Sequence, residues 1–331
     1  MFKTIKLNLK NKIFLLILKK FFLSITFVIA FTFLVYLILI SLYPLPLNEE
    51  AKLTSNQFVS INLVEQSKEY NLDKTAFTKS FLFLWKLITF SAIKFSQVDT
   101  SIAVFSNNDR NAWTYFVSNN EVNYLIIIFS QFLSFIIGYL LGVWAGYKKR
   151  SYIDYLINFF SVLFLSTSLL IVIPIIIHFE YLFGIIVNYN PKKISTFLFP
   201  IVTIVLISQS AIVKIVRGET IKGLFHPSYT YYKSLGFSEW SIFRKSILKN
   251  TIVALLPLFP FLLVGSLSSS VFLETYFNIP GNWKHIYGIL IKKEIGPICV
   301  LIYLIVLSFS ISYFACEVIR IILNPFVERS K

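Results

Sequence analysis

The sequence predicts an all-α, polytopic membrane protein with six transmembrane helices. Hydrophobic residues make up 56% of the 331 residues and charged residues only 14%, whereas typical soluble domains carry about 25% charged residues. The apolar residues gather in runs of roughly 20 residues, the length that a helix needs to cross a bilayer. A single soluble core could not hide this much apolar surface, so lipid is expected to cover the rest. The predicted spans are 21–43, 122–147, 153–177, 194–213, 251–273 and 295–318.

The first span follows Lys19 and Lys20 and could be mistaken for a secretory signal peptide. Residues 21–42 contain no charged residue, so the run is longer than the usual core of a signal peptide, and no small-residue cleavage site follows it. We therefore expect this helix to remain in the protein.

The distribution of Lys and Arg predicts that both termini lie in the cytoplasm. With this orientation the cytoplasmic segments hold 19 basic residues and the longer extracellular segments hold 12, which is the bias of proteins in the cell (plasma) membrane. The predicted regions are a cytoplasmic N-terminus (1–20), the first span (21–43), an extracellular region (44–121), a five-helix core (122–318) with a cytoplasmic loop (214–250), and a cytoplasmic tail (319–331).

Residues 80–93 form a shorter run that is apolar except for Lys86. The run is short for a span, and a seventh crossing would reverse the side of every later loop. We therefore predict an amphipathic helix in the extracellular region, either lying on the membrane surface or packed on the bundle.

The net charge of +15 does not indicate nucleic-acid binding. The basic residues lie between apolar runs and do not form a patch on a soluble fold, so they indicate membrane topology.

The two cysteines, Cys299 and Cys316, fall in one predicted helix at a separation that prevents a disulfide between them. No cluster of Cys and His indicates a metal site, and no cofactor is expected.

The chain is not expected to be an enzyme. Residues 218–223 have the glycine spacing of a phosphate-binding loop, but Leu224 and Phe225 stand where Lys and Ser or Thr are required. Charges inside the predicted spans are limited to Asp154 and Glu317, both near helix ends. Asp154 is expected to cap its helix and not to transfer protons. Any energy-requiring step is therefore expected to depend on another chain.

Three glycines mark one face of the second predicted span. Gly138, Gly142 and Gly146 recur every four residues, so they lie on one helix face and allow another backbone to approach closely. The sequence leaves open whether that neighbour belongs to this chain or to a partner.

The predicted cytoplasmic loop 214–250 is long, basic and rich in aromatic residues. We expect a helix that ends at Gly236 and a second helix with Ser238 as its N-cap. Tyr231, Tyr232, Leu235 and Phe237 would then form an exposed apolar knob, which is typical of a docking surface. The alternative is a hairpin that packs under its own bundle.

This loop resembles the "EAA" coupling loop of ABC importer permeases, a helix–glycine–helix hairpin that sits in a groove of an ATPase subunit. The resemblance rests on Gly236, on Phe237 and Ser238, and on 247–250, which end at Asn250. Arg217 resembles the arginine that precedes the loop in this family. The sequence departs from the family at its two alanine positions, where Tyr231 and Tyr232 stand.

A second segment, 274–281, resembles the E-T-x-F-x-x-P-G signature of peptide and nickel permeases of this class. Glu274, Phe277, Pro280 and Gly281 match its fixed positions. Residues 71–74 and 324–325 weakly resemble the B-type permease subunit of oligopeptide transporters. The resemblance is strongest from Gly138 onward.

The resemblance implies a permease subunit that moves oligopeptides by alternating access, driven by separate subunits. It implies a second homologous permease subunit, two ABC ATPase subunits and an extracellular substrate-binding lipoprotein as partners, within a lipid bilayer and without nucleic acid. Segment 274–281 would then help to form an outer gate. Three alternatives remain open: the same family carrying nickel or another small solute, an ion-coupled carrier that acts alone, and a membrane assembly factor without transport.

Overall fold

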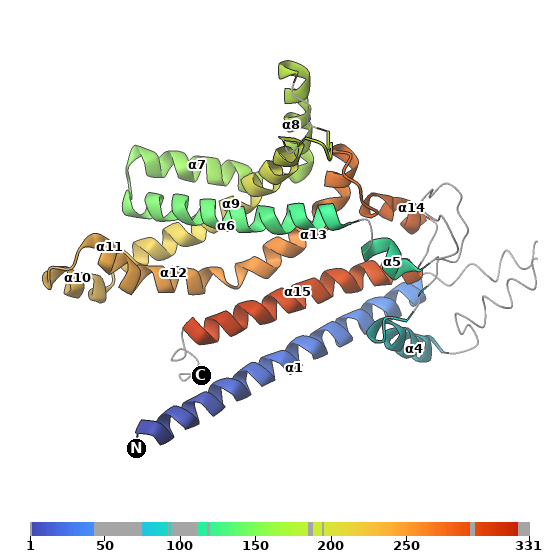
Figure 1. The fold of residues 1–331 in the computed structure, drawn as a ribbon, viewed down its shortest axis with the longest axis horizontal. Coiled ribbons are helices and arrows are strands. Elements are labelled where there is room, and N and C mark those ends of the chain that lie inside the picture. The colour runs from blue at the N-terminus through green and yellow to red at the C-terminus, as the bar shows by residue number, and fades with distance from the viewer. Residues whose placement is uncertain are drawn as a thin grey trace, which may run out of the picture. The chain divides into compact units, whose positions relative to one another are not determined.

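The computed structural model describes residues 2–42, 75–91, 93, 111–117, 120–184, 188–193, 195–291 and 295–323. These residues form helices and turns, without a β-strand among them (Figure 1), so the predicted all-α class is confirmed. The helical elements are α1 (Phe2–Leu42), α4 (Ala76–Ile88), α5 (Ala112–Val117), α6 (Glu121–Tyr147), α7 (Tyr152–Ser166), α8 (Leu169–Phe183), α9 (Ser195–Leu224), α10 (Pro227–Ser234), α11 (Glu239–Ile242), the π-helical turn η1 (Phe243–Ile247), α12 (Leu248–Leu255), α13 (Leu258–Tyr276), the short 3₁₀ helix η2 (Trp283–His285), α14 (Ile286–Ile291) and α15 (Ile295–Leu323).

Five of the described helices are long and apolar enough to cross a membrane: α1, α6, α9, α13 and α15. A sixth crossing is possible through α7 and α8, which bend by 106° at the break between them. The predicted all-α polytopic membrane protein is thus confirmed, with five to six candidate spans. The predicted span 153–177, however, is not one straight helix.

The bend between α7 and α8 follows from three consecutive hydroxyl residues, Ser166, Thr167 and Ser168. The hydroxyls of Ser166 and Thr167 both donate to the carbonyl of Leu163, at 2.9 and 2.6 Å. Thr167 is extended (φ −88°, ψ 130°), and the Ser168 hydroxyl accepts from the amide of Leu170 at 3.3 Å. The Thr167 amide still donates to the same Leu163 carbonyl at 3.1 Å, so the hydroxyls add to the last helical bond. Ser and Thr side chains that bond the local backbone in this way often bend a helix, and here the helix stops and restarts in a new direction.

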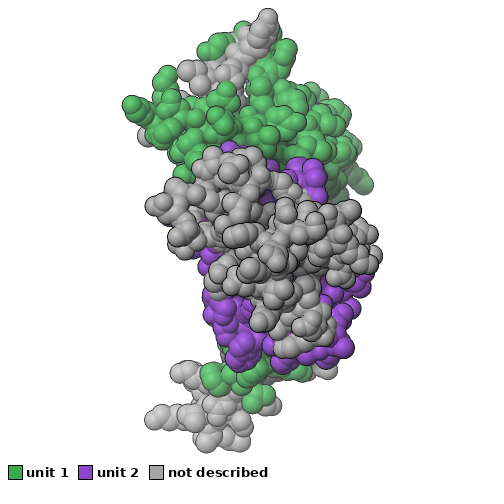
Figure 2. Space-filling model, turned by 90° about the vertical axis from the view of Figure 1, so that its right-hand side faces the viewer, with its two compact units in different colours: residues 1–24, 122–281, 308–331 green, residues 25–121, 282–307 purple. Residues whose placement is uncertain are grey.

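The chain folds as two compact units, which are coloured separately in Figure 2. Unit 1 comprises 1–24, 122–281 and 308–331, and unit 2 comprises 25–121 and 282–307. Unit 1 holds the glycine stripe, the loop 214–250 and the segment 274–281, so both candidate sites lie within it.

The glycine stripe of α6 packs against α9 of the same chain. A methyl group built on Gly138, Gly142 or Gly146 would come within 2.7–2.9 Å of the side chain of Ile212, Val216 or Thr220, respectively. Both sets of residues advance by four, so α6 and α9 run parallel in close contact. The neighbour that the sequence left open is therefore a helix of the same unit.

The other helices of unit 1 alternate in direction. Ile157 of α7 packs with Ala145 and Val213, so α7 starts at the end of the bundle where α6 and α9 finish. At the opposite end, the amide of Tyr189 donates to the carbonyl of Phe277 at 2.8 Å. The chain that contains α7 and α8 therefore leads from one end of the bundle to the other, as a broken span would.

The start of α1 and the end of α15 lie at the same end of unit 1. The first part of α1 packs antiparallel to the last part of α15, as the ring pair Phe21–Phe314 (5.4 Å) and the hydroxyl pair Ser24–Ser310 show. Phe309 of α15 contacts Phe261 near the start of α13 at 5.3 Å, which places the α15 terminus at the end that carries α10 and α11. An even number of crossings would place the start of the first helix and the end of the last helix at the same end in this way. Which membrane face this end occupies stays a prediction.

Candidate functional site

The loop 214–250 is a helical hairpin that extends from α9. Residues 214–224 continue the α9 helix, so the loop proper begins later than the sequence indicated. His226 caps α10 by accepting from the amide of Ser228 at 3.2 Å, and Pro227 occupies the first helical turn, a position that needs no amide donor. Gly236 follows α10 with φ +79°, a left-handed conformation that glycine adopts without strain. This residue turns the chain into α11.

The hairpin exposes a group of large apolar side chains, which we call the hairpin surface: Tyr231, Leu235, Phe237 and Trp240. Tyr231 is 61% exposed and Trp240 is 65% exposed. The half-buried Tyr232 supports them, because its ring contacts that of Tyr231 at 5.7 Å and that of Phe237 at 5.6 Å. A cluster of this kind at a helix–turn–helix tip, away from the spanning part of the helices, has the features of a protein-docking surface.

Polar contacts hold the two arms of the hairpin together. The Tyr229 hydroxyl donates to the Glu239 carboxylate at 2.7 Å, and Lys233 lies 3.5 Å from the same carboxylate. Burial, together with the hydrogen bond to Glu239 and its charge, raises the pKa of Tyr229 to about 12, so the hydroxyl keeps the proton that it donates. The Lys245 ammonium stands 3.9 Å from the centre of the Phe237 ring. The hairpin surface therefore has a basic edge that is tied to one of its aromatic members.

The second arm contains a π-helical turn, η1, before α12. The Leu248 amide bonds the carbonyl of Phe243, five residues earlier, and the Asn250 side chain donates to the carbonyl of Ser246 at 3.1 Å. Ile247 of this turn fits against Gly223 of α9, where an added methyl group would come within 2.9 Å. π-turns are rare but occur frequently at functional sites, and this one joins the hairpin to α12, the short helix that precedes the spanning helix α13.

Arg217 does not belong to the hairpin surface but to an ion pair with the buried Asp154, in which Arg217 itself is partly exposed. Its guanidinium makes two bonds to the Asp154 carboxylate, at 2.6 and 2.9 Å. Asp154 also accepts from the amide of Arg150 at 3.0 Å, while the Ser151 hydroxyl caps the Asp154 amide. Asp154 is thus part of the helix cap that the sequence predicted, and in addition it connects the start of α7 to α9. A bidentate pair of this geometry is directional and strong.

The segment 274–281 folds around a buried carboxylate at the opposite end of unit 1. Glu274 is 1% exposed and accepts from the Asn123 amide of α6 at 2.6 Å. Gly281 lies so close to this carboxylate that a methyl group in its place would overlap it. Phe277 is fully buried, and its carbonyl accepts from the amide of Tyr189. The fixed spacing of Glu, Phe and Gly in this segment therefore has a direct packing cause, whereas Pro280 is exposed.

A buried polar residue, Gln131, connects three spanning helices in the middle of unit 1. Its amide nitrogen donates to the hydroxyl of Ser266 on α13 and lies 3.4 Å from the hydroxyl of Ser208 on α9. It also lies 3.3 Å from the carbonyl of Leu262. Polar side chains between membrane helices commonly serve as such cross-links.

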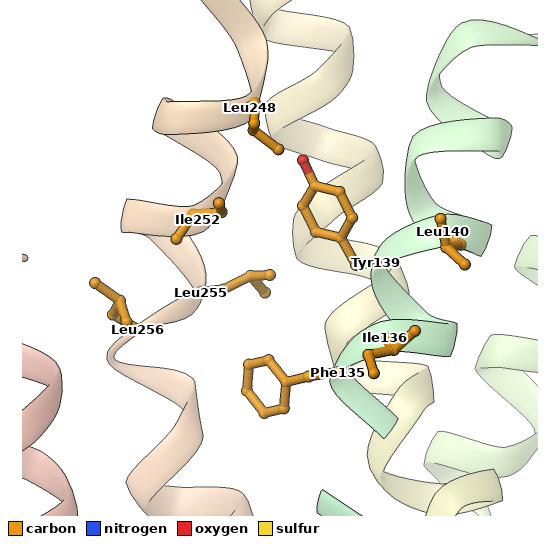
Figure 3. Close-up of a pocket in the computed structure, with 8 residues that line it drawn as sticks. All are labelled: Phe135, Ile136, Tyr139, Leu140, Leu248, Ile252, Leu255 and Leu256. Atoms are coloured by element: carbon orange, nitrogen blue, oxygen red, sulfur yellow. The ribbon is translucent and has the colours of Figure 1, made fainter. Parts of the chain in front are cut away.

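An open apolar pocket of about 400 Å³ lies between α6 and α12 (Figure 3). The only hydroxyl in its lining is that of Tyr139, which bonds the Thr251 hydroxyl at 3.0 Å. The pocket shows that α12 does not fill the space beside α6 at this level. Its lining residues are Phe135, Ile136, Tyr139, Leu140, Leu248, Ile252, Leu255 and Leu256.

The structure thus places most of the candidate residues in two groups, while Arg217, Asn250 and the glycine stripe lie along the helices between them. Tyr231, Tyr232, Leu235, Gly236 and Phe237 lie together at the hairpin tip, and the segment 274–281 lies at the far end of the same bundle. Ser238 occupies the N-cap position of α11 as expected, but its side chain makes no capping hydrogen bond.

Sequence reasoning missed the partners of the charged residues. Asn123 and Gln131 could have been noticed as isolated polar residues inside an apolar run. Asp154 and Arg217 could have been paired, because both lie near the cytoplasmic ends that the sequence predicted for neighbouring spans.

Some sequence-based predictions lie outside the described residues. They concern the segments 71–74 and 324–325 and most of the predicted extracellular region.

Comparisons with known proteins agree with this arrangement. The chain matches the family described as "Binding-protein-dependent transport system inner membrane component" over residues 138–329. It is 23% identical over 216 residues to the dipeptide transport system permease protein of Lactococcus lactis subsp. cremoris (strain MG1363), covering 64% of this chain and 67% of that protein. It is also 23% identical over 229 residues to the oligopeptide transport system permease protein of Mycoplasma genitalium (strain ATCC 33530 / DSM 19775 / NCTC 10195 / G37), covering 65% of this chain.

The match to the Mycoplasma protein covers 54% of that protein, so the chain spans about half its length. The family match covers more than half of this chain. It starts at Gly138, the first glycine of the stripe, and includes both the hairpin and the segment 274–281. The chain therefore belongs to the family of binding-protein-dependent transport system inner membrane components.

Proposed function

We propose that this chain is the permease subunit of an ATP-binding-cassette importer in the plasma membrane, where it translocates oligopeptides by alternating access. In this proposal a second homologous permease completes the pore, two ATPase subunits supply energy, and an extracellular substrate-binding lipoprotein delivers the substrate. Both chain ends then face the cytoplasm. Family membership and the names of the two relatives, which are dipeptide and oligopeptide permeases, support this reading.

The observation that carries the proposal is the hairpin surface. Tyr231, Leu235, Phe237 and Trp240 expose large apolar side chains at the tip of a short helix–glycine–helix motif that extends beyond the spanning part of α9. Water is a poor solvent for such a cluster, and the proposed topology places the hairpin in the cytoplasm, so a partner protein is expected to cover it. The basic edge formed by Lys233 and Lys245 suits an acidic rim on that partner.

The contacts of α9 suggest how a movement of the hairpin would be transmitted to the spanning helices. Arg217 joins α9 to α7 through Asp154, and the glycine stripe joins α9 to α6. A displacement of the hairpin would therefore move three helices together and not one alone. Such a displacement needs a partner with different affinities for the two states, which nucleotide binding to the ATPase would supply.

The segment 274–281 is proposed to form part of an outer gate. Its position at the end of the bundle opposite the hairpin supports this role, as does the way that Glu274, Asn123 and Gly281 fix the turn after α13. A gate at this end would open and close out of phase with movement at the hairpin end, as alternating access requires.

The experiment that tests the coupling role changes Gly236 to Leu. Apart from its chain neighbours, no atom lies within 4 Å of a Cβ placed there, so the substitution is expected to act mainly through the positive φ. We expect Gly236→Leu to insert normally, to lose co-purification with the ATPase subunits and to lose uptake of labelled peptides. The matched control is Gly236→Asn, because Asn tolerates this conformation, and it should retain most of both activities.

Two outcomes would count against the coupling role. Gly236→Leu could retain both the ATPase subunits and peptide uptake, or Gly236→Asn could lose them to the same extent. If the wild-type chain binds its ATPase subunits but takes up a different solute, the coupling role would stand and the proposed oligopeptide substrate would be wrong.

A further inference from the structure

Helix α4 of unit 2 carries three different flanks. Its buried face packs within the unit, a second flank exposes large apolar side chains, and a third carries two half-buried lysines. The buried residues are Ser80, Phe83, Leu84 and Leu87. The exposed apolar residues are Phe77, Phe81, Trp85 and Ile88. The lysines are Lys79 and Lys86.

The three flanks are arranged differently from those of a helix on the surface of a soluble protein, where the side opposite the buried face is polar. At about 100° per residue, the apolar flank is centred about 105° from the buried face on one side, and the lysine flank about 100° from it on the other. The apolar and lysine flanks therefore point in nearly opposite directions, and both stand at right angles to the packed face. A helix that lies in a membrane interface beside a spanning helix needs this arrangement, with lipid on one flank and headgroups or water on the other.

The level at which α4 meets α1 places it at the membrane interface. The Phe83 ring stacks on Tyr36 at 4.0 Å and the Phe77 ring meets Phe33 at 5.3 Å. The apolar part of α1 is Phe14–Ser41, so Phe33 and Tyr36 lie about 8–13 Å from its midpoint towards Leu42. The hydrocarbon core extends about 15 Å from the bilayer centre. Helix α4 therefore packs on α1 just inside the edge of the hydrocarbon.

The surface of α1 at this level supports the same environment. Phe31, Leu34 and Ile38 of this spanning helix are exposed, and lipid is the solvent of a spanning helix. The exposed flank of α4, where Phe81 is 60% and Trp85 61% exposed, is apolar in the same way. Trp is the residue most typical of the membrane–water boundary.

We propose that α4 is an interfacial anchor whose Phe77–Phe81–Trp85–Ile88 flank is immersed in the phospholipid at the Leu42 end of α1. Lys79 and Lys86 then face the headgroups, where their charge favours anionic phospholipid. The lipid covers an apolar flank that water would leave unfavourably hydrated, and the anchor fixes the level of the segment that follows α1. The occupant is the bilayer itself, and this inference does not depend on the proposed transport function.

The test measures the surroundings of single spin labels on α4 in the full-length chain, reconstituted into nanodiscs of phosphatidylcholine and phosphatidylglycerol. Labels are placed at Phe81→Cys and Trp85→Cys on the apolar flank and at Lys79→Cys and Lys86→Cys on the lysine flank. Collisions with oxygen report lipid, and collisions with a water-soluble nickel chelate report water. We expect the oxygen-to-nickel collision ratio to be several-fold higher at Phe81 and Trp85 than at the two lysine positions.

The labels require a background without the two native cysteines, which are both buried, so Cys299→Ala and Cys316→Ala are introduced first. Phe77→Cys and Ile88→Cys form a second pair on the apolar flank, in case a variant of the first pair fails to insert. Nickel collisions at the apolar flank as frequent as those at the lysine flank would place it in water and overturn the proposal. Protection of the apolar flank from both agents would show a protein cover and would also overturn it.

Discussion

A methyl group added at Gly142 is the sharpest probe of the contact between α6 and α9. In Gly142→Ala the new Cβ would lie 2.7 Å from the Val216 Cβ and 3.0 Å from the Val213 carbonyl oxygen, where ordinary contacts are 3.4–4 Å. Neither atom is the end of a flexible side chain, so the two helices must separate by roughly 1 Å in a close-packed interior. That separation would also loosen the bond from Gln131 to Ser208.

The expected magnitude combines two opposing effects. Overpacking a tight interface costs about 1–3 kcal/mol, whereas Gly→Ala inside a helix gains up to about 1 kcal/mol of helix propensity. We expect a net loss of about 1–2 kcal/mol for Gly142→Ala. The matched control is Gly218→Ala on α9, where no atom lies within 4 Å of the new methyl group. The control should show only the gain in propensity.

The assay is thermal unfolding of both variants in the same detergent at one scan rate, because such transitions are often irreversible and depend on the rate. Gly142→Ala should unfold at a lower temperature than the wild type, and Gly218→Ala at the same temperature or higher. An equal or higher midpoint for Gly142→Ala relative to Gly218→Ala would refute the close α6–α9 contact.

Three further substitutions test the buried polar contacts by thermal unfolding. Asp154→Asn should destabilise by about 1–3 kcal/mol, less than a fully buried pair because Arg217 is partly exposed, and the double variant Asp154→Asn/Arg217→Gln should recover part of the loss. Glu274→Ala should destabilise by about 1–3 kcal/mol because the Asn123 amide loses its acceptor, whereas Glu274→Gln should keep most of the stability. Gly281→Ala should destabilise by overlap with the Glu274 carboxylate, and should do so less on a Glu274→Ala background.

Each of these predictions has an outcome that would contradict it. Strictly additive effects in the cycle of Asp154 and Arg217 would show that the two residues do not interact. Equal stability of Glu274→Ala and Glu274→Gln would remove the hydrogen bond to Asn123 as a source of stability. An unchanged effect of Gly281→Ala after Glu274 is truncated would mean that the overlap involves other atoms.

Hydropathy and charge were sufficient to predict the helical membrane fold, because lipid imposes a simple length and composition on each span. They could not predict the break at Thr167. That break depends on hydroxyl groups that bond their own backbone, and Ser and Thr are common in unbroken membrane helices too. The fourth span was predicted to end too early for a different reason: Lys214 and Arg217 end the apolar run, whereas the helix continues to Leu224.

The pairings within the candidate sites required knowledge of which helices are neighbours. The glycine stripe could be recognised from its spacing, but its partner α9 could not. Glu274 stood alone in the sequence because Asn123 lies 151 positions away. The left-handed turn at Gly236, by contrast, is local, and local backbone preferences can be read from a few residues. The coupling role of that turn stays a prediction.

The two sides of the hairpin are attached to the bundle with unequal rigidity. On the α9 side, the helix is continuous from Ser195 to Leu224 and is held by the glycine contacts of α6 and by the ion pair to α7. On the α12 side, the chain passes through a π-helical turn, borders an open pocket beside α6, and breaks again at Pro257, which lacks an amide donor. A packed interface resists displacement, whereas a segment with interrupted hydrogen bonding and free space beside it yields at lower cost. A displacement applied to the hairpin tip is therefore expected to move α12 relative to α6 before it disturbs the contact between α6 and α9.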